Sequence, residues 1–326
     1  MTRQPEAIWR PEGERIANSA LLRLMGRCSV KDYDSLQGLA LADAETYWRH
    51  VVTDLKLPFR EPFRAFLDTS AGIEWPRWFV GGKLNFTDAV LEGMAGVTQP
   101  NDIAVREYSE AGTVRTVSRE MLRGEVELAM KRLVSLGVRR GDRVGVLLPN
   151  VIEAVFVIVA IARMGAIVVP LYSGFGPDAI AARINAAGAK ALVVCNGFVR
   201  NGREVRPVRL LNEVVMLCPH LERIATICIL KTIDSAEKNS SSIWWDTIET
   251  GEPVEAPALD PADPWMIMFT SGTTGRPKGT VHTHSGFPIR VTHDVAYQYD
   301  FHPGDRFFWY SDMGWMVGPL ALCASL

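Results

Sequence analysis

The chain has 326 residues, of which 48% are hydrophobic and 22% are charged, and its formal net charge is −2. This near-neutral balance is typical of a globular protein with roughly one to three domains, and it argues against a basic surface for nucleic acid. The five cysteines form no CxxC pair and are odd in number, so a closed disulfide framework is excluded and a reducing cytoplasm is expected. The N-terminus lacks the apolar run of a signal peptide, and residues 151–164, the most apolar segment, are too short to span a membrane.

Residues 1–95 form the first predicted region, which is rich in Trp and Pro. Apolar residues at near-helical spacing predict a helix over residues 43–56, DAETYWRHVVTDLK. The region ends with WPRWFVGGKLN, residues 75–85, whose two Trp and paired Gly are typical of a loop held by buried aromatic rings.

Strands and helices alternate from about residue 100 onward, as the hydrophobic periodicity indicates. The predicted helices cover residues 119–136, 151–164 and 177–189, and the predicted strands cover residues 141–149, 166–172 and 190–195. Continuously apolar strands separated by helices indicate parallel-rich sheets covered by helices, so the predicted fold class is α/β.

Residues 231–264 are rich in Ser, Pro and acidic residues and predict a surface connection that touches the core at Trp244 and Trp245. A strand is predicted next over residues 265–269, and a loop rich in Gly, Ser and Thr follows it directly. Beyond this loop the sequence predicts a helix over residues 287–299 and a strand over residues 306–311, RFFWYS.

The loop TSGTTGRPKG suggests a site for a polyphosphate. A Gly-rich loop behind a buried strand can turn several backbone N–H groups toward phosphate oxygens. The hydroxyl groups add donors, and Lys278 adds a full positive charge. The residues predicted to bind ATP phosphates are Thr270, Ser271, Gly272, Thr273, Thr274, Gly275 and Lys278.

Two other interpretations of this loop fit its residues less well. A Walker A loop requires Gly-Lys followed by Ser or Thr, whereas Gly279 follows Lys278 here. A tight strand-to-helix turn that happens to carry hydroxyl groups explains a lone GxG better than it explains ten consecutive residues of this composition.

The same ten residues resemble the signature loop of the adenylate-forming superfamily, which includes acyl-CoA synthetases, luciferases and peptide-synthetase adenylation domains. The resemblance implies a two-step reaction: a carboxylate attacks the α-phosphate of ATP and releases pyrophosphate, and a thiol then displaces AMP. It implies that the loop, Lys278 and Mg²⁺ bind the departing phosphates.

Two further stretches resemble acetyl-CoA synthetases in particular. WFVGGKLN, residues 78–85, resembles the end of their N-terminal cap region, which implies a cap over residues 1–95 and an AMP-binding domain over residues 96–326. CNGFVRNGREV, residues 195–205, resembles their segment that contacts the nucleotide end of CoA, which implies that Arg200 and Arg203 bind CoA phosphates. A solvated basic loop is the alternative for the two arginines.

GDRFFWYSDMGWMVGP, residues 304–319, resembles the segment that carries Asp, Gly and Trp before the acyl pocket of acetyl-CoA synthetases. The resemblance places Trp315, Met316 and Val317 near the acyl group. Acetyl-CoA synthetases typically have Val-Thr-Gly-His where this chain has Met-Val-Gly-Pro, so another short carboxylic acid is a plausible substrate.

His282 and His284 pose the question of a metal site, but no third ligand accompanies them at zinc-like spacing, so structural roles and no metal site are expected. No Ser-His-Asp set can be assigned either. The resemblance assigns no catalytic residue within this chain, because the family's catalytic Lys belongs to a small C-terminal domain that we expect to be absent.

Two functions remain open for a chain that we expect to be the N-terminal portion of a larger ligase, since the apolar end GPLALCASL has no helix-stop signal. The first is an acid-thiol ligase that forms an acyl-CoA from a short-chain carboxylate such as acetate, ATP and CoA, with no nucleic-acid or membrane partner. The second is a non-catalytic remnant that at most binds nucleotide phosphates or CoA.

Overall fold

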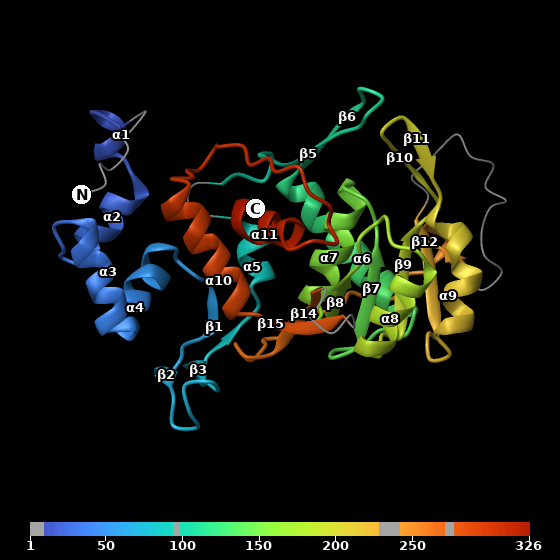
Figure 1. Cartoon of the computed structure of the whole chain (residues 1–326), viewed down its shortest axis with the longest axis horizontal. Helices are drawn as coiled ribbons and strands as arrows, with labels where there is room; N and C mark the ends of the chain where they lie inside the picture. The colour runs from blue at the N-terminus through green and yellow to red at the C-terminus, as the bar shows by residue number, and fades with distance from the viewer. Residues whose placement is uncertain (1–9, 94–97, 228–241, 271–276) are drawn as a thin grey trace, which may run out of the picture.

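The computed structural model describes residues 10–93, 98–227, 242–270 and 277–326. Figure 1 shows a helical N-terminal region beside a larger body built around one twisted sheet. No helix among the described residues is both long and apolar enough to cross a bilayer.

The large sheet has seven strands within the described ranges, in the order β13–β12–β9–β7–β8–β14–β15. Neighbouring strands are parallel except β14 and β15, which are antiparallel. The strands are β7 (Arg143–Leu147), β8 (Ile167–Pro170), β9 (Ala191–Cys195), β12 (Arg223–Ile227), β13 (Ser242–Trp244), β14 (Pro264–Thr270) and β15 (Lys278–Thr283). The prediction of an α/β fold with a parallel-rich sheet is confirmed.

Helices cover both faces of this sheet. Successive strand residues point to opposite faces, so each face presents apolar side chains to its own set of helices. In β9, Ala191 and Val193 pack in one core cluster with α6 and α7, whereas Leu192 and Val194 pack in a second cluster with α8 and α9. These helices are α6 (Arg119–Ser135), α7 (Ile152–Arg163), α8 (Pro177–Ala187) and α9 (Leu211–Leu217). The first three confirm the helices predicted over residues 119–136, 151–164 and 177–189.

The strand order reverses around β7, because the chain passes to β8 on one side and later to β9 on the other. In an open α/β sheet, ligands bind outside the carboxyl ends of the strands at such a reversal. The segments that follow β8 and β9 leave the sheet at this carboxyl edge, and β14 ends there.

The N-terminal region contains helices and two small two-stranded sheets. Its elements are α1 (Glu14–Ala17), α2 (Ala20–Arg27), α3 (Tyr33–Ala42), α4 (Ala44–Asp54), β1 (Phe59–Glu61), β2 (Ala65–Asp68), β3 (Arg77–Val80), β4 (Lys83–Leu84) and α5 (Thr87–Glu92). Asn85, at the end of WFVGGKLN, is fully buried and donates a hydrogen bond to the carbonyl of Arg163 at 2.8 Å. The predicted domain boundary at residue 95 lies outside the described residues.

The N-terminal helices pack against α10 (Gly286–His293) and the π-helical turn Asp294–Gln298 that continues it. The phenolic oxygen of Tyr47 lies 2.7 Å from Nε2 of His293, and the hydroxyl of Tyr297 donates to Asp54 at 2.7 Å. The helix predicted over residues 287–299 is therefore confirmed as one α-helix that ends in a π-helical turn.

Two sequence predictions need correction. Residues 306–311 form no strand, because the described residues place no strand beside them and the side chains of Phe308 and Tyr310 stay more than four-fifths exposed. Residues 231–264 are not only a surface connection, since residues 242–244 add β13 to the sheet edge. Trp245 is buried there, as predicted, and lies beneath the guanidinium of Arg132.

Candidate functional site

A cleft of about 2700 Å³ opens at the carboxyl edge of the sheet. Two hairpins border it and project from the same side of the molecule (Figure 1). They are β5 (Ile103–Tyr108) with β6 (Val114–Ser118), and β10 (Phe198–Arg200) with β11 (Arg203–Val205). Most of residues 301–318, part of the helix α11 (Val317–Ser325) and residues 55–58 also line it.

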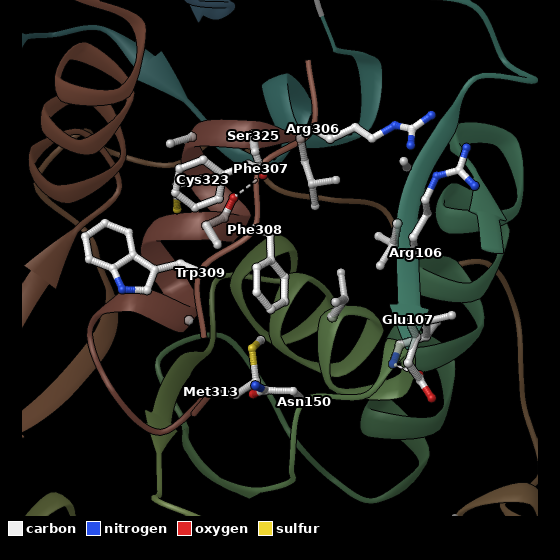
Figure 2. A pocket seen from close by; sticks show the side chains of 18 of the residues that line it. Arg106, Glu107, Asn150, Arg306, Phe307, Phe308, Trp309, Met313, Cys323 and Ser325 are labelled. Atoms are coloured by element: carbon white, nitrogen blue, oxygen red, sulfur yellow. Dashed lines mark hydrogen bonds between the residues drawn. The ribbon is translucent and has the colours of Figure 1, made fainter. Parts of the chain in front are cut away.

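Aromatic rings and arginines lie along this cleft. Figure 2 shows the ring of Phe308 pointing into the open space above Met313 and Asn150, with Arg106 on the strand that faces it. Residues 301–311 are held to the sheet by the side-chain amide of Asn150, which donates a hydrogen bond to the carbonyl of Ser311. A ligand with both flat apolar and anionic parts would find matching groups here.

Thr270 and Lys278 lie opposite each other on neighbouring strands, at the open end of β14 and β15. Both residues are exposed at the carboxyl edge of β14. Five of the predicted phosphate-binding residues, Ser271, Gly272, Thr273, Thr274 and Gly275, lie outside the described residues. The register thus places the lysine and the first threonine of the loop side by side.

Asp312 is a buried carboxylate that joins three segments of the cleft. One oxygen accepts a hydrogen bond from the backbone N–H of Gly314 at 2.8 Å and from that of Ser173 at 3.3 Å. The other oxygen accepts from the Ser173 hydroxyl and lies 3.0 Å from Nη2 of Arg200. The Asp312 side chain is 8% exposed, so this ion pair is largely shielded from water.

Arg200 and Arg203 have different surroundings, although both stand on the β10–β11 hairpin. The guanidinium of Arg200 lies 5.4 Å from the ring centre of Tyr172 and 5.1 Å from that of Phe198, in addition to its ion pair with Asp312. Arg203 is exposed. The structure therefore ties Arg200 into the cleft wall and leaves Arg203 facing solvent.

The turn of this hairpin presents backbone N–H groups to an anion. The carboxylate of Glu110, at the tip of the β5–β6 hairpin, accepts hydrogen bonds from the N–H groups of Asn201 and Gly202, both at 2.8 Å. Hydrogen bonding by Gly202 and then Asn201 lowers the pKa of Glu110 below its usual value. A phosphate oxygen could accept the same two bonds.

The three predicted acyl-pocket residues follow Asp312 directly. Trp315 is 47% exposed and its ring lies 5.6 Å from that of Tyr172. Met316 is 51% exposed, and Val317 begins α11. Trp315 and Val317 therefore line the cleft, where a small ligand could contact them, whereas Met316 between them is exposed but does not line it.

His282 and His284 are packed rather than solvated. Burial lowers the pKa of His284 to about 3, so its ring is neutral, and the ring centre lies 5.2 Å from that of Phe86. The ring of His282 lies 4.9 Å from that of Phe287. Within the described ranges, no group of three or more His, Cys, Asp or Glu side chains could hold a metal ion.

Sequence reasoning assigned no role to Asp312, Ser173 or Glu110. Asp312 lies within the motif that suggested the acyl pocket, so its presence was visible but its partners were not. Ser173 and Glu110 come from segments more than 130 and 90 residues away from the groups they contact, and no local pattern marks them.

Comparisons with known proteins identify the family of the chain. The model of the AMP-binding enzyme family matches residues 95–326, and that of the acetyl-coenzyme A synthetase N-terminus matches residues 33–90. An acetyl-coenzyme A synthetase of Laribacter hongkongensis is 30% identical over 302 residues, 90% of this chain and 45% of that protein. One of Gemmatimonas aurantiaca is 34% identical over 260 residues, 76% of this chain and 40% of that protein.

A solved structure is similar over almost the whole chain. The acetoacetyl-CoA synthetase from Streptomyces lividans superposes with a TM-score of 0.88 at 27% identity, covering 98% of this chain and 50% of that one. The chain therefore spans about half the length of the relatives it matches.

Proposed function

We propose, because the chain belongs to the AMP-binding enzyme family, that it supplies the N-terminal part of an acyl-CoA synthetase that activates a short-chain carboxylate with ATP and transfers the acyl group to CoA. One observation supports this proposal above the others. Lys278, the β10–β11 hairpin and Trp315 all stand at the carboxyl edge of the same seven-stranded sheet, the edge at which ligands bind in open α/β sheets.

In the first step, a carboxylate oxygen of the acid bonds to the α-phosphorus of ATP, and the bond from that phosphorus to the bridging oxygen breaks. Pyrophosphate leaves with the bonding electrons, and its negative charge grows in the transition state. Lys278 would offset this charge, and the hydroxyl of Thr270 opposite it would donate to a phosphate oxygen. We propose the same phosphate-binding role for Ser271, Gly272, Thr273, Thr274 and Gly275.

Mg²⁺ would neutralise part of the phosphate charge when ATP is bound. The described residues offer no cluster of metal-binding side chains, so we propose that the ion arrives with the ATP phosphates.

In the second step, the CoA thiolate sulfur bonds to the acyl carbon and AMP leaves with its oxygen. We propose that the β10–β11 hairpin binds the phosphates at the nucleotide end of CoA. Arg203 would contribute an exposed guanidinium, Arg200 would add positive charge, and the N–H groups of Asn201 and Gly202 would donate to phosphate oxygens.

We propose a short-chain acid as the acyl substrate, held by Trp315, Met316 and Val317. The related proteins are named for acetyl and acetoacetyl groups. A flexible Met side chain beside an indole ring suits a small acyl group of adjustable length better than one fixed acid.

A second candidate function is binding without turnover. These 326 residues span about half the length of their relatives, and we propose that by themselves they bind nucleotide or CoA phosphates without completing the reaction. We expect the isolated chain to show no carboxylate-dependent exchange of pyrophosphate into ATP, and robust exchange by the isolated chain would contradict this expectation.

The decisive experiment measures carboxylate-dependent pyrophosphate exchange in the natural protein that carries this chain at its full length. Lys278→Ala should slow the exchange by roughly two to three orders of magnitude, because one charge-stabilising donor is lost. The matched control is Lys190→Ala, since Lys190 pairs with Asp142 at the opposite edge of the sheet. Equal exchange rates in both variants would refute the role of Lys278, and no exchange in the wild type with any short acid would refute the function.

The proposed binding of CoA by the β10–β11 hairpin needs a separate test. Arg203→Ala should raise the apparent KM for CoA by about tenfold while the exchange rate is unchanged, because phosphate contacts act only in the second step. Arg223→Ala is the control, since Arg223 begins β12 at the far edge of the sheet. A defect in the exchange reaction instead would show that the hairpin serves adenylate formation.

A further inference from the structure

We infer that Asp312 is a positioning residue that acts through Arg200 and Ser173. It fixes residues 315–317, the proposed acyl pocket, relative to the β10–β11 hairpin, the proposed CoA site. The purpose assigned to this link rests on the proposed function, whereas the link itself rests on geometry. It revises the role of Arg200: this guanidinium acts mainly by binding Asp312, and Arg203 is the direct phosphate ligand.

The contacts of Asp312 reach three segments that are far apart in the chain. Ser173 follows β8, Arg200 ends β10, and Gly314 leads into the acyl-pocket residues. Four polar contacts converge on the two carboxylate oxygens: two from Ser173, one from the N–H of Gly314, and the charged hydrogen bond from Nη2 of Arg200. A carboxylate satisfied by three segments fixes their relative positions.

Burial makes this arrangement stiff. The side chains of Asp312 and Arg200 are 8% and 29% exposed, so water screens their attraction poorly. The rings of Tyr172 and Phe198 flank the guanidinium and leave it little room for another orientation. If either partner were removed, the other would remain as a shielded charge without a counter-ion, so the segments would move to rehydrate it.

The backbone beside Asp312 is also tightly packed. A Cβ atom on Gly314 would lie 2.2 Å from the backbone nitrogen of Tyr172 and 2.5 Å from the carbonyl oxygen of Leu171. The Asp312–Gly314 turn therefore lies directly on the chain that leaves β8. Trp315 follows at once, so a shift of the carboxylate is passed to the indole that borders the cleft.

The consequence is that the hairpin and the acyl pocket form one unit. If the hairpin bound CoA, the ion pair would set where the acyl group lies relative to the arriving thiol. Small misplacements of reacting atoms are costly, since a shift of about 1 Å can reduce a rate by roughly a hundredfold. Asp312 would therefore influence the acid and CoA together and would leave ATP unaffected.

The first test measures hydrogen exchange in the 326-residue chain and needs no activity. Asp312→Asn keeps the shape of the side chain and removes its charge. It should accelerate exchange by about tenfold or more in both residues 198–205 and residues 312–316, because the two segments lose their shared restraint. Ser173→Ala, a milder change, should accelerate exchange in residues 312–316 by about threefold.

The matched control is Asp54→Asn, which alters an even more buried carboxylate in the N-terminal helices, outside the two segments that are measured. It should leave both cleft segments unchanged. If Asp312→Asn fails to fold, the Ser173→Ala result decides by itself. Unchanged exchange in residues 312–316, or acceleration in one segment alone with Asp312→Asn, would overturn the inference.

The second test uses steady-state kinetics of the full-length protein. Asp312→Asn should raise the KM for both the carboxylate and CoA by about tenfold while the KM for ATP stays within about twofold. A merely structural residue would lower the melting temperature and the amount of active enzyme without separating the three KM values. Equal changes in all three would overturn the inference. A wild type that forms no acyl-CoA would refute the proposed function, while the exchange experiment would still decide the role of Asp312.

Discussion

Two buried carboxylates, Asp54 and Asp312, have similar chemistry in different places. Asp54 accepts hydrogen bonds from Arg23, Arg27 and the hydroxyl of Tyr297, between the N-terminal helices and the π-helical turn. Asp312 accepts from one arginine, one serine and backbone N–H groups beside an open cleft.

The difference lies in what surrounds each cluster. The Asp54 cluster is enclosed by apolar packing between α2, α4 and the π-helical turn, so its interactions hold two parts of the fold together. Aromatic side chains beside the Asp312 cluster are instead exposed to solvent at 47% for Trp315 and 48% for Trp309. A buried carboxylate inside packed helices contributes to stability, whereas one at a cleft fixes the geometry of groups that can meet a ligand.

The largest expected effect is on stability at Asp54. Asp54→Ala should lower the free energy of unfolding by about 2–3 kcal/mol, because the buried hydroxyl of Tyr297 loses its acceptor, whereas the half-exposed side chains of Arg23 and Arg27 can rehydrate. Urea unfolding followed by circular dichroism measures it, with Glu92→Ala, a 60% exposed partner of Arg123, as control. A loss below about 1 kcal/mol would show that Asp54 contributes no more to stability than an ordinary surface salt bridge does.

The stabilisation by Asp54 should also depend on pH in one direction. Burial raises the pKa of Asp54, but hydrogen bonds from Arg23 and Tyr297 outweigh it, so the pKa lies below its usual value. A group with a depressed folded pKa stabilises the fold above its unfolded pKa of about 4, and this contribution disappears as the pH falls through the folded pKa.

The second prediction probes the backbone contact at the cleft. Gly314→Ala should lower the free energy of unfolding by about 1–3 kcal/mol, since its Cβ would meet backbone atoms that cannot swing aside. Gly202→Ala is unsuitable as a control because its φ of 70° is itself strained, whereas Gly124→Ala, in open space on α6, should stabilise slightly. If both alanine variants were equally stable, the Asp312–Gly314 turn would not pack tightly against the chain that leaves β8.

Sequence reasoning succeeded where local patterns decide structure and failed where distant segments meet. The apolar runs and helical periods of residues 119–195 predicted strands and helices to within a few residues. RFFWYS, residues 306–311, has the composition of a strand, yet no strand lies beside it within the described ranges. A strand requires a hydrogen-bonding neighbour, and its own sequence cannot supply one.

The candidate site shows the same limit. Local motifs pointed to Lys278, Arg203 and Trp315, and the structure puts each at the carboxyl edge of the sheet. The motif also suggested that Arg200 contacts a phosphate, but its partners Asp312 and Tyr172 come from segments 112 and 28 residues away. The partners of an ionisable group depend on tertiary structure, so its role could not be read from neighbouring residues alone.

The third prediction concerns His284, a buried polar side chain that, unlike the two carboxylates, has no hydrogen-bond partner for its ring nitrogens among the described residues. Its pKa of about 3 lies far below the unfolded value near 6.5, because burial disfavours the charged ring. The unfolded chain therefore binds a proton that the folded chain does not, and stability falls as the pH drops below about 6.5.

Between pH 6.5 and 5.5 His284 should reduce the free energy of unfolding by about 1 kcal/mol. Asp54 does not titrate in this window, so the two effects separate. Comparing the pH dependence of unfolding in the wild type and His284→Gln measures the contribution, and His302→Gln, with a side chain 37% exposed, is the control. A wild-type slope that survives in His284→Gln would assign it to other histidines, such as His282 and His293, whose pKa values burial also lowers.

The smallest expected effect concerns Glu110, an exposed carboxylate that contrasts with both buried ones. It occupies the N–H groups of Asn201 and Gly202, where we propose that a CoA phosphate binds. Glu110→Gln removes the competing charge and should tighten CoA binding by about two- to fivefold at low salt, with less gain at high salt.

Calorimetric titration with CoA and with dephospho-CoA measures this gain, and Glu120→Gln, on the exposed first turn of α6, is the control. A gain seen with CoA alone would place the 3′-phosphate at the hairpin turn, whereas an equal gain with both would place the diphosphate there. Weaker binding of both ligands would mean that Glu110 orders the hairpin for CoA instead of competing with it. In that case Glu110, although exposed, would fix the geometry of the cleft as Asp312 does. The solvent exposure of a carboxylate would then not tell whether it has a positioning role.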